Sequence, residues 1–389
     1  MKILMIGWGF PPKIQGGLDI HVYEICKELA KKNDLSLVLP EFNSPRENSA
    51  GIKIIPIKCK LSKNLAKTVS EYNRNIVKEC RNLDFDVVHS HDWFGVEASE
   101  KLKTKAPWVF TLHSLEYMRS CGPGKKSIME RLERRGAKKC DRIIAVSGFM
   151  KNSIVKNCGI VPQKIEVVYN SATIQKGKPE KIRRLLRLGN KPVVFFVGRL
   201  SQQKGIEYLI YSAKSVLEKI PDARFVIAGE GHLKESLEKF SRHMGLNREI
   251  VFPGFVPEAD LPSYYSAADV FVYPSIYEPF GISVLESLLS GTPAITSEQA
   301  GILERLPKMD SVATIKPGNS KQLADKIVHF LSTRNRVSSK EKQLLTNIYS
   351  WQKSAEQITE IYSKVAKGER RRQEMPSVKM ASFQNQKLI

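Results

Sequence analysis

The 389-residue sequence has few of the features that mark disulfide-bonded, zinc-binding or membrane-spanning proteins. Its six cysteines are scattered without a Cys-x-x-Cys pair, which argues against both a disulfide framework and a zinc site. No apolar run approaches the ~20 residues that span a bilayer. The apolar start at residues 1–7 is short and charged residues soon follow, so it predicts a first strand instead of a signal peptide. We therefore expect a cytoplasmic protein.

Acidic residues are scarce: 40 Asp and Glu stand against 62 Lys and Arg, a formal net charge of +22. This balance favours a polyanionic partner, whether nucleic acid, an anionic membrane surface or a phosphorylated substrate. The basic excess gathers between Lys125 and Arg142 and again at Arg370 to Arg372. A solvated surface helix is the favoured interpretation of the first cluster, and a membrane-contacting helix is the alternative. No stacking motif or recognition helix is evident, so we expect no specific nucleic acid.

Short apolar strands alternate with helical patterns in two series, which predicts an α/β fold with parallel sheets. The chain is longer than one core usually supports, so two Rossmann-like domains are expected at residues 1–174 and 192–348. Residues 175–191 are polar and basic and are expected to connect them, and residues 367–389 are expected to form a mobile tail. The expected strands are residues 2–6, 35–39, 87–89, 109–112, 143–146 and 165–169, then 193–197, 224–228, 250–252, 270–273, 294–296 and 312–315.

Two carboxylates, Glu278 and Glu286, lie around the expected start of a helix. Glu278 belongs to the loop after the strand at 270–273, whereas Glu286 lies on the helix that follows. Amides near Gly281 and Ile282 would point outward at the positive end of the helix dipole, which suits a phosphate group. Hydroxyl-binding carboxylates beside a phosphate site suggest a sugar nucleotide. An ordinary capped helix is the alternative.

Glycines and cations follow other expected strands. Gly16 and Gly17 precede a helix and would permit close backbone approach by a ligand, although they complete no G-x-G-x-x-G fingerprint and could form a simple turn. Arg199 can make a forked contact and Lys204 a point-charge contact to phosphate oxygens, so together they could neutralise a diphosphate leaving group. Either cation alone could be a solvated surface charge. Gly229 ends the next strand, where a base or ribose could approach.

Histidines end two neighbouring strands, at His89 with His91-Asp92-Trp93 and at His113. Their positions indicate a polar cleft that could hold an acceptor. Metal binding is less favoured because no third ligand has a suggestive spacing. The Asp84-Phe85-Asp86 run resembles a metal-binding D-x-D but directly precedes a buried strand, so the end of a loop is the better interpretation.

Together these motifs resemble the retaining glycosyltransferases of the GT-B fold, family 4, over roughly residues 1–366. Within that family, the His-Asp-Trp run and the Pro-Pro-x-x-x-Gly-Gly start are similar to archaeal and bacterial glycogen or starch synthase-type members. The resemblance also implies that a helix within residues 349–366 crosses back onto the N-terminal domain. The motifs that carry it are Gly16-Gly17, His91-Asp92-Trp93, Thr111-Leu112-His113, Gly198-Arg199, Lys204-Gly205, Glu278-Pro279-Phe280-Gly281 and Glu286.

The resemblance implies a role for each matching residue. Arg199 and Lys204 would hold the diphosphate of a UDP-, ADP- or GDP-linked hexose, and amides at Gly281 and Ile282 would assist them. Glu286 would bind the ribose, while Glu278 and His113 would orient the sugar and Gly16-Gly17 would close over the donor. No metal or other cofactor would be needed, because the leaving phosphate itself would draw the proton from the acceptor. These groups are expected to lie in a solvated cleft, so replacing Lys204 is expected to leave the melting temperature near the wild-type value.

The sequence departs from the family pattern at three places: Asn170-Ser171-Ala172-Thr173, residues 298–304 and Asp310-Ser311. These departures leave the diphosphate contacts intact, but the sugar and the acceptor, whether carbohydrate or lipid-linked, remain unassigned. A lipid-linked acceptor would place the enzyme at the inner face of the membrane. Two other function classes stay open: a GT-B sugar-nucleotide epimerase, which needs no acceptor, and a basic nucleic-acid-binding protein.

Overall fold

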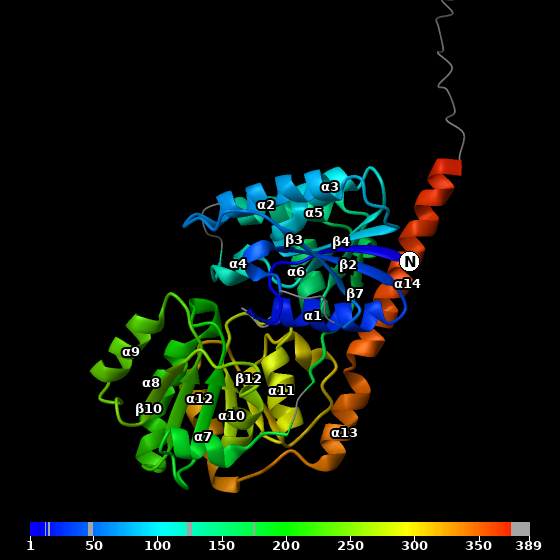
Figure 1. The fold of residues 1–389 in the computed structure, drawn as a ribbon. Helices are drawn as coiled ribbons and strands as arrows, with labels where there is room; N and C mark the ends of the chain where they lie inside the picture. The colour runs from blue at the N-terminus through cyan, green and yellow to red at the C-terminus, as the bar shows by residue number, and fades with distance from the viewer. Residues whose placement is uncertain (12, 15, 46–49, 123–126, 174–175, 375–389) are drawn as a thin grey trace, which may run out of the picture.

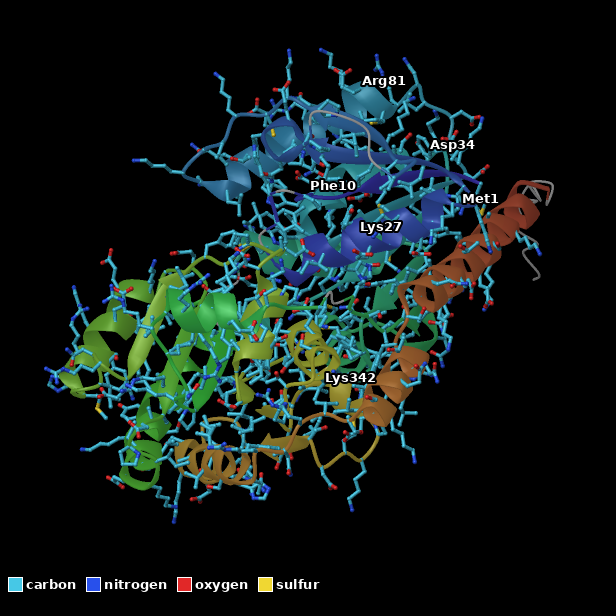
Figure 2. All side chains as sticks on the ribbon, turned by 60° about the horizontal axis from the view of Figure 1, so that its bottom comes forward. Met1, Phe10, Lys27, Asp34, Arg81 and Lys342 are labelled. Atoms are coloured by element: carbon cyan, nitrogen blue, oxygen red, sulfur yellow. The ribbon has the colours of Figure 1, made fainter. Side chains whose placement is uncertain are left out.

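The computed structural model describes all residues except 12, 15, 46–49, 123–126, 174–175 and 375–389. It has two α/β domains, each built on a parallel sheet with helices on its faces (Figure 1). The predicted architecture of two Rossmann-like α/β domains with parallel sheets is confirmed. Helix α1 (Gly17–Ala30) lies along the boundary between the domains, and Lys27 marks it in Figure 2.

The N-terminal sheet has seven parallel strands in the order β3-β2-β1-β4-β5-β6-β7. Its strands are β1 (Lys2–Ile6), β2 (Asp34–Pro40), β3 (Lys53–Ile57), β4 (Val87–His91), β5 (Trp108–Leu112), β6 (Arg142–Ala145) and β7 (Ile165–Val167). Besides α1, its helices are α2 (Leu65–Cys80), α3 (Val96–Leu102), α4 (Glu116–Arg119), α5 (Ile128–Lys139) and α6 (Gly148–Cys158), with 3-10 turns η1 (Glu41–Asn43), η2 (Asp92–Gly95) and η3 (Pro162–Lys164). The inner strands are buried on both faces, as expected for a sheet covered by crossover helices.

The C-terminal sheet has six parallel strands in the order β10-β9-β8-β11-β12-β13. They are β8 (Val193–Val197), β9 (Arg224–Ala228), β10 (Ile250–Gly254), β11 (Val270–Tyr273), β12 (Ala294–Ser297) and β13 (Val312–Ile315). The helices are α7 (Pro179–Leu185), α8 (Ile206–Lys219), α9 (Lys234–His243), α10 (Leu261–Ala267), α11 (Ile282–Ser290), α12 (Ser320–Thr333), α13 (Ser339–Ile348) and α14 (Trp351–Glu374), with η4 (Gln202–Lys204) and η5 (Gly301–Glu304).

Strand β3 is the one described strand for which the sequence carried no prediction. It contains Pro56, which has no N–H to donate to a neighbouring strand and so argues against a strand in the middle of a sheet. The structure resolves the conflict because β3 lies at the edge of its sheet and pairs only with β2. Strand β10, which runs through Pro253, is likewise at an edge.

Helix α14 crosses from the C-terminal domain and packs along α1, as Figure 1 shows. The hydroxyl of Tyr362 lies 2.6 Å from Nδ1 of His89 under the N-terminal sheet. The helix continues to Glu374, past the end at 366 that was expected from the sequence; the rest of the expected tail, 375–389, lies outside the described residues. Within the described part of the chain, no helix is both long enough and apolar enough to cross a membrane. All six cysteines are free thiols.

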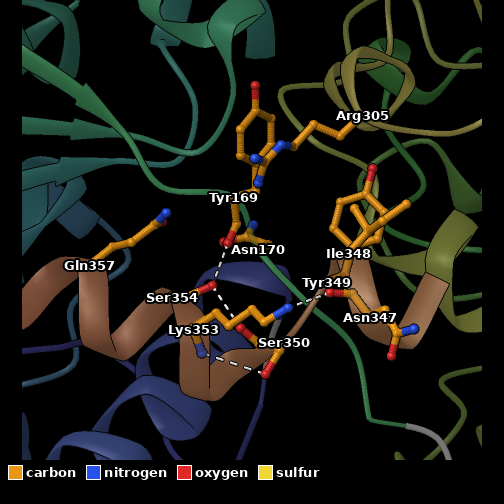
Figure 3. A pocket seen from close by; sticks show the side chains of 10 residues that line it. All are labelled: Tyr169, Asn170, Arg305, Asn347, Ile348, Tyr349, Ser350, Lys353, Ser354 and Gln357. Atoms are coloured by element: carbon orange, nitrogen blue, oxygen red, sulfur yellow. Dashed lines mark hydrogen bonds between the residues drawn. The ribbon is translucent and has the colours of Figure 1, made fainter. Parts of the chain in front are cut away.

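Several polar contacts join the domains next to the interdomain connection. The carboxylate of Glu304 on η5 accepts hydrogen bonds from the backbone N–H groups of Gly148 and Phe149, at the start of α6 in the other domain. A carboxylate is favourable there because the first amides of a helix are unpaired and carry partial positive charge. The Ser354 hydroxyl on α14 donates to the Tyr169 carbonyl at 2.7 Å and so ties the two chain crossings together (Figure 3).

Candidate active site

A buried ion pair between Lys204 and Glu278 lies beyond the carboxyl ends of β8 and β11. Lys204 Nζ is 2.7 Å from Oε2 of Glu278, and the two side chains are only 14% and 9% exposed. The ammonium also lies 4.7 Å from the centre of the Tyr273 ring, and the Ser275 hydroxyl donates to the same carboxylate oxygen at 3.3 Å. Burial alone would lower the pKa of Lys204, but attraction to Glu278 outweighs it and holds that pKa above its usual value. Lys204 is therefore a fixed cation.

Helix α11 begins four residues after Glu278, and backbone hydrogen bonds from η5 hold the loop that leads into it. Gly281, its N-cap, has φ 109°, a left-handed backbone conformation that glycine adopts without strain. The carbonyl groups of Glu278 and Phe280 accept hydrogen bonds from the backbone of η5, at 3.0 and 2.8 Å. Among the residues that the structure describes, no side chain caps α11; the N–H of Val284 donates to the Gly281 carbonyl, and the N–H groups of Ile282 and Ser283 before it have no side-chain cap beside the buried cation. Such an end of a helix can bind an anion.

Glu286 lies four residues after Ile282 and hence on the same face of α11. Its side chain accepts a hydrogen bond from the Tyr265 hydroxyl at 2.7 Å, and the residue is 8% exposed. Burial raises the pKa of Glu286 to about 7; the Tyr265 hydrogen bond opposes this shift and the charge of Glu258 adds to it. Near neutral pH this carboxyl is therefore poised between its protonated and ionised forms.

The N-terminal domain reaches this place through α1 and α4. A Cβ added at Gly17 would lie 3.4 Å from Cδ1 of Ile282, so the start of α1 faces the start of α11, and around Gly16 the same position is open. The Tyr117 hydroxyl on α4 donates to the Tyr277 hydroxyl, one residue before Glu278, at 3.1 Å. The groups predicted from the two halves of the sequence thus lie together across the domain boundary.

Two other predicted donor residues have different surroundings. Arg199 is exposed in the loop after β8, and its guanidinium makes no hydrogen bond or ion pair with any residue that the structure describes. It is free to contact a ligand. Gly229 has a structural reason to be glycine, because a Cβ there would lie 1.9 Å from the carbonyl oxygen of Gly198. The approach of a base or ribose to Gly229 stays a prediction.

Three histidines gather on the N-terminal side, including one, His21, that the sequence analysis did not select. His91 Nδ1 lies 3.0 Å from His113 Nε2, and the His21 ring centre lies 4.5 Å from that of His113. One ring nitrogen from each of the three lies within 4.8 Å of the others, so the cluster could hold a metal ion. His21 is one helical turn from Gly17 on α1, a local signal that could have pointed to it. Its Nδ1 contacts Asn170 Oδ1 at 2.7 Å, and its buried Nε2 has no partner among the described residues.

Burial lowers the pKa of all three histidines, and that of His113 to about 3. His113 is therefore a neutral imidazole at physiological pH. It can orient a hydroxyl by donating or accepting a hydrogen bond, but it cannot serve as a cation.

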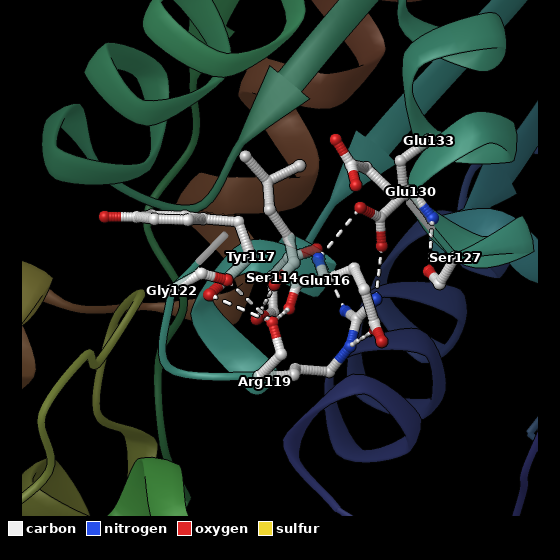
Figure 4. A network of polar contacts seen from close by, with 10 residues as sticks. Ser114, Glu116, Tyr117, Arg119, Gly122, Ser127, Glu130 and Glu133 are labelled. Carbon is white, nitrogen blue, oxygen red and sulfur yellow. Dashed lines mark hydrogen bonds and ion pairs between the residues drawn. The ribbon is translucent and has the colours of Figure 1, made fainter. Parts of the chain in front are cut away.

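The loop that carries His113 is held by a buried polar network (Figure 4). Arg119 donates to Glu116, to Glu133 and to the backbone carbonyl of Ser114. Glu133 in turn accepts the backbone N–H of Glu116 at 2.9 Å, which fixes α4 against α5. The network therefore sets the position of the segment from His113 to Tyr117.

The three residues expected in an acceptor cleft, His91, Asp92 and Trp93, are all buried, and their role toward an acceptor stays a prediction. Trp93 is only 4% exposed and stacks on Phe94 with ring centres 4.5 Å apart, so it belongs to the core. Asp92 is buried and accepts the backbone N–H of His113 at 2.7 Å, while His91 is buried beneath His113. The sequence around the end of β4 could not show that these residues are buried, because their burial depends on the helices that cover the strand ends.

The basic cluster around α5 is partly neutralised. Arg134 pairs with Glu130 and Arg135 pairs with Glu100, at 3.0 and 2.6 Å. Lys125 and Lys126 lie outside the described residues. These ion pairs support the solvated surface helix, and membrane contact stays a prediction.

Comparison with known proteins gives matches over most of the chain. The family model described as Glycosyltransferase Family 4 matches residues 15–176, and the model described as Glycosyl transferases group 1 matches residues 177–351. An uncharacterized glycosyltransferase of Methanocaldococcus jannaschii is 29% identical over 93% of this chain and 98% of its own length. The alpha-maltose-1-phosphate synthase of Mycolicibacterium smegmatis is also 29% identical, over 94% of this chain and 100% of its own length.

Solved structures agree on the fold. The Anabaena protein HepE, in complex with UDP and glucose, superimposes with a TM-score of 0.76 over 93% of this chain and 99% of its own. Its sequence identity is 19%, so this likeness concerns the fold alone.

Proposed function

Because this chain belongs to the family 4 glycosyltransferases, we propose that it moves a hexose from a nucleotide diphosphate sugar to a carbohydrate or lipid-linked acceptor, with retention of anomeric configuration and without a metal ion. The observation that carries the proposal is the buried Lys204–Glu278 pair at the open start of α11, facing Gly17 of the other domain. A fixed cation beside the start of a helix that no described side chain caps suits a diphosphate.

In this proposal the diphosphate lies between Lys204, the exposed Arg199 and the amides at the start of α11. Charge builds up on the leaving phosphate as the bond to the sugar breaks, and groups already oriented toward that charge stabilise it most. Glu278 holds Lys204 and accepts hydrogen bonds from the sugar. Glu286 binds the ribose, and neutral His113 orients the sugar from the opposite domain.

In this proposal the acceptor attacks the sugar on the same face from which the phosphate leaves. The leaving phosphate takes the proton from the acceptor hydroxyl, and the anomeric configuration is therefore retained. Glu278 is already engaged by Lys204 and Ser275, so it is suited to positioning and not to attack. Catalysis then consists mainly of orientation and electrostatic stabilisation. The names of the relatives, a maltose-1-phosphate synthase among them, favour a carbohydrate acceptor.

A donor screen tests the proposal. Saturating UDP-, ADP- and GDP-glucose are expected to raise the melting temperature unequally, because a ligand that binds only the folded state at a hundredfold excess over its Kd stabilises it by about 2.7 kcal/mol. The shift should shrink in Arg199→Ala and persist in the surface control Lys321→Ala. No shift with any nucleotide sugar would contradict the proposal. A sugar that changes without an acceptor would indicate the epimerase instead.

Removal of metal ions tests the proposal that sugar transfer needs no metal ion. We expect transfer to continue within about twofold of the untreated rate after dialysis against a chelator, since Lys204 and the helix amides supply the positive charge. Initial rates of sugar transfer before and after treatment measure this. A large loss that zinc or manganese reverses would contradict it, and loss of that metal response in His21→Ala would assign the ion to the histidine cluster.

A further inference from the structure

A cavity of about 440 Å³ lies between the two chain crossings that join the domains. Tyr169 and Asn170 come from the first crossing, and Tyr349 and Ser350 come from the second (Figure 3). None of the described residues that line the cavity is acidic. Nothing in the donor site described above uses it.

The cavity carries two cations whose charge is not neutralised. The Arg305 guanidinium lies 4.9 Å from the centre of the Tyr169 ring and makes no ion pair with a described residue. Lys353 donates to the backbone carbonyl of Asn347 at 2.6 Å and keeps its charge and its other two donors. The neighbouring Glu304 carboxylate is taken up by the start of α6 and by the Tyr169 hydroxyl.

Most of the remaining lining residues carry polar groups that can hydrogen-bond to hydroxyls. The side-chain amide of Gln357 and the hydroxyl of Ser350 line this space together with the two cations; Asn347 also lines it, and its amide oxygen accepts a hydrogen bond from Gln343 at 3.2 Å. Two cations that line one cavity suit a phosphate or carboxylate, and the amide and hydroxyl groups beside them suit a polyol. The cavity has the size of a small-molecule site.

The walls of this cavity also contact the donor site from behind. The rings of Tyr169 and Tyr349 pack against Phe280, with centres 6.4 and 5.8 Å apart, and Phe280 directly precedes Gly281. Asn170 contacts His21, which lies against His113. A ligand that fits between the crossings therefore favours one arrangement of the Glu278–Gly281 loop and of the domains.

We propose that this hinge cavity binds a small anionic polyol, such as a sugar phosphate, and that its occupation tightens donor binding. The proposal that the cavity binds an anionic polyol depends on the cavity alone. The proposal that this binding tightens donor binding rests on the proposed function. Because the described arrangement brings Gly17 to Ile282, a ligand that stabilises it also assembles the donor site. Coupling is reciprocal, so the donor must strengthen sugar phosphate binding by the same factor.

Calorimetric titration of the full chain with a hexose 6-phosphate, and separately with inorganic phosphate and neutral hexose, tests the site. We expect saturable binding of the hexose phosphate, weakened about tenfold or more in Arg305→Gln/Lys353→Gln, since hydrogen bonds to charged groups are lost. Arg248→Ala/Lys321→Ala removes the same charge elsewhere and should bind as the wild type does. Absence of binding, or unchanged binding in the Arg305/Lys353 variant, would overturn the proposal.

Two further titrations complete the test. Lys204→Ala should still bind the hexose phosphate; if binding is lost there and kept in the Arg305/Lys353 variant, the ligand occupies the donor site and the proposal is wrong. Saturating hexose phosphate should lower the Kd of the donor by about fivefold or more. An unchanged donor Kd would overturn the coupling. Donor binding without hexose phosphate is measured separately, so a failure of the proposed transferase activity would be recognised as such.

Discussion

Replacing Lys204 with alanine is expected to lower kcat about a hundredfold or more, whereas the Kd of the donor should rise much less. The reason is that the ammonium faces a phosphate whose charge grows as the sugar leaves, so its contribution is larger in the transition state than in the ground state. Single-turnover rates and equilibrium titration of the donor separate the two effects. Wild-type turnover in purified Lys204→Ala, with the correct donor and acceptor present, would contradict the role assigned to this residue.

The structure changes one part of this expectation. The sequence analysis placed Lys204 in a solvated cleft, where its loss would hardly affect stability, but the ion pair with Glu278 is largely buried. Removing one partner of a buried pair leaves an uncompensated charge, which typically costs about 3–5 kcal/mol. The melting temperature of Lys204→Ala should therefore fall.

A double variant distinguishes a catalytic loss from a loss of stability. Lys204→Ala/Glu278→Gln has no buried unpaired charge, so it should regain part of the melting temperature without regaining turnover. If turnover returned together with stability, Lys204 would be a structural residue only. Arg199→Ala offers a comparison, because its exposed side chain has no partner among the described residues and its loss should leave the melting temperature unchanged.

Much of the fold was predictable because apolar strands and their spacing are local properties of the chain. Every strand that the sequence analysis expected is present, with ends shifted by a few residues. The candidate donor residues were predictable for a related reason: in parallel sheets, ligands bind beyond the carboxyl ends of the strands. Strand β3 escaped prediction because the tolerance of Pro56 depends on its place at a sheet edge.

What the sequence could not show are pairings between distant residues. Glu304 looked like part of a departure from the family pattern, yet it binds the start of α6, some 150 residues earlier in the chain. His21 and Asn170 meet in the same way. The burial of Trp93 and of the Lys204–Glu278 pair also depends on segments that pack over them. The polar interior between the domains could therefore be described only from the structure.

The second large effect is expected at Glu286, where the buried carboxyl has a pKa of about 7. Donor hydroxyls bind an ionised carboxylate more strongly than a neutral group, so donor affinity in the wild type should rise with pH up to about 7 and then level off. Glu286→Gln should bind the donor on the order of tenfold or more weakly at pH values above 7 and should show little pH dependence. Below the pKa the two proteins should converge.

The raised pKa of Glu286 affects stability in the opposite direction: donor affinity rises with pH, whereas the stability of the folded protein falls. The pKa of Glu286 is raised above its usual value, so the folded state binds the proton more tightly than the unfolded state between pH 4.5 and about 7. Stability of the wild type therefore falls as the pH rises through this window, and Glu286→Gln lacks that loss. Glu286→Gln should accordingly melt above the wild type in alkaline buffer and lose this advantage toward acidic pH, while binding the donor less well.

Donor titrations over this range, in two buffers of different ionisation enthalpy, test both parts of the prediction. The wild type should release up to one proton on binding donor near neutral pH, because the bound ribose favours the ionised carboxylate, and Glu286→Gln should release none. Tyr265→Phe is a useful companion, since it removes the hydrogen bond that lowers the pKa of Glu286 and should move the wild-type profile to higher pH. Equal donor affinity of the wild type and Glu286→Gln in alkaline buffer would exclude Glu286 from the donor site, whatever the melting temperatures showed.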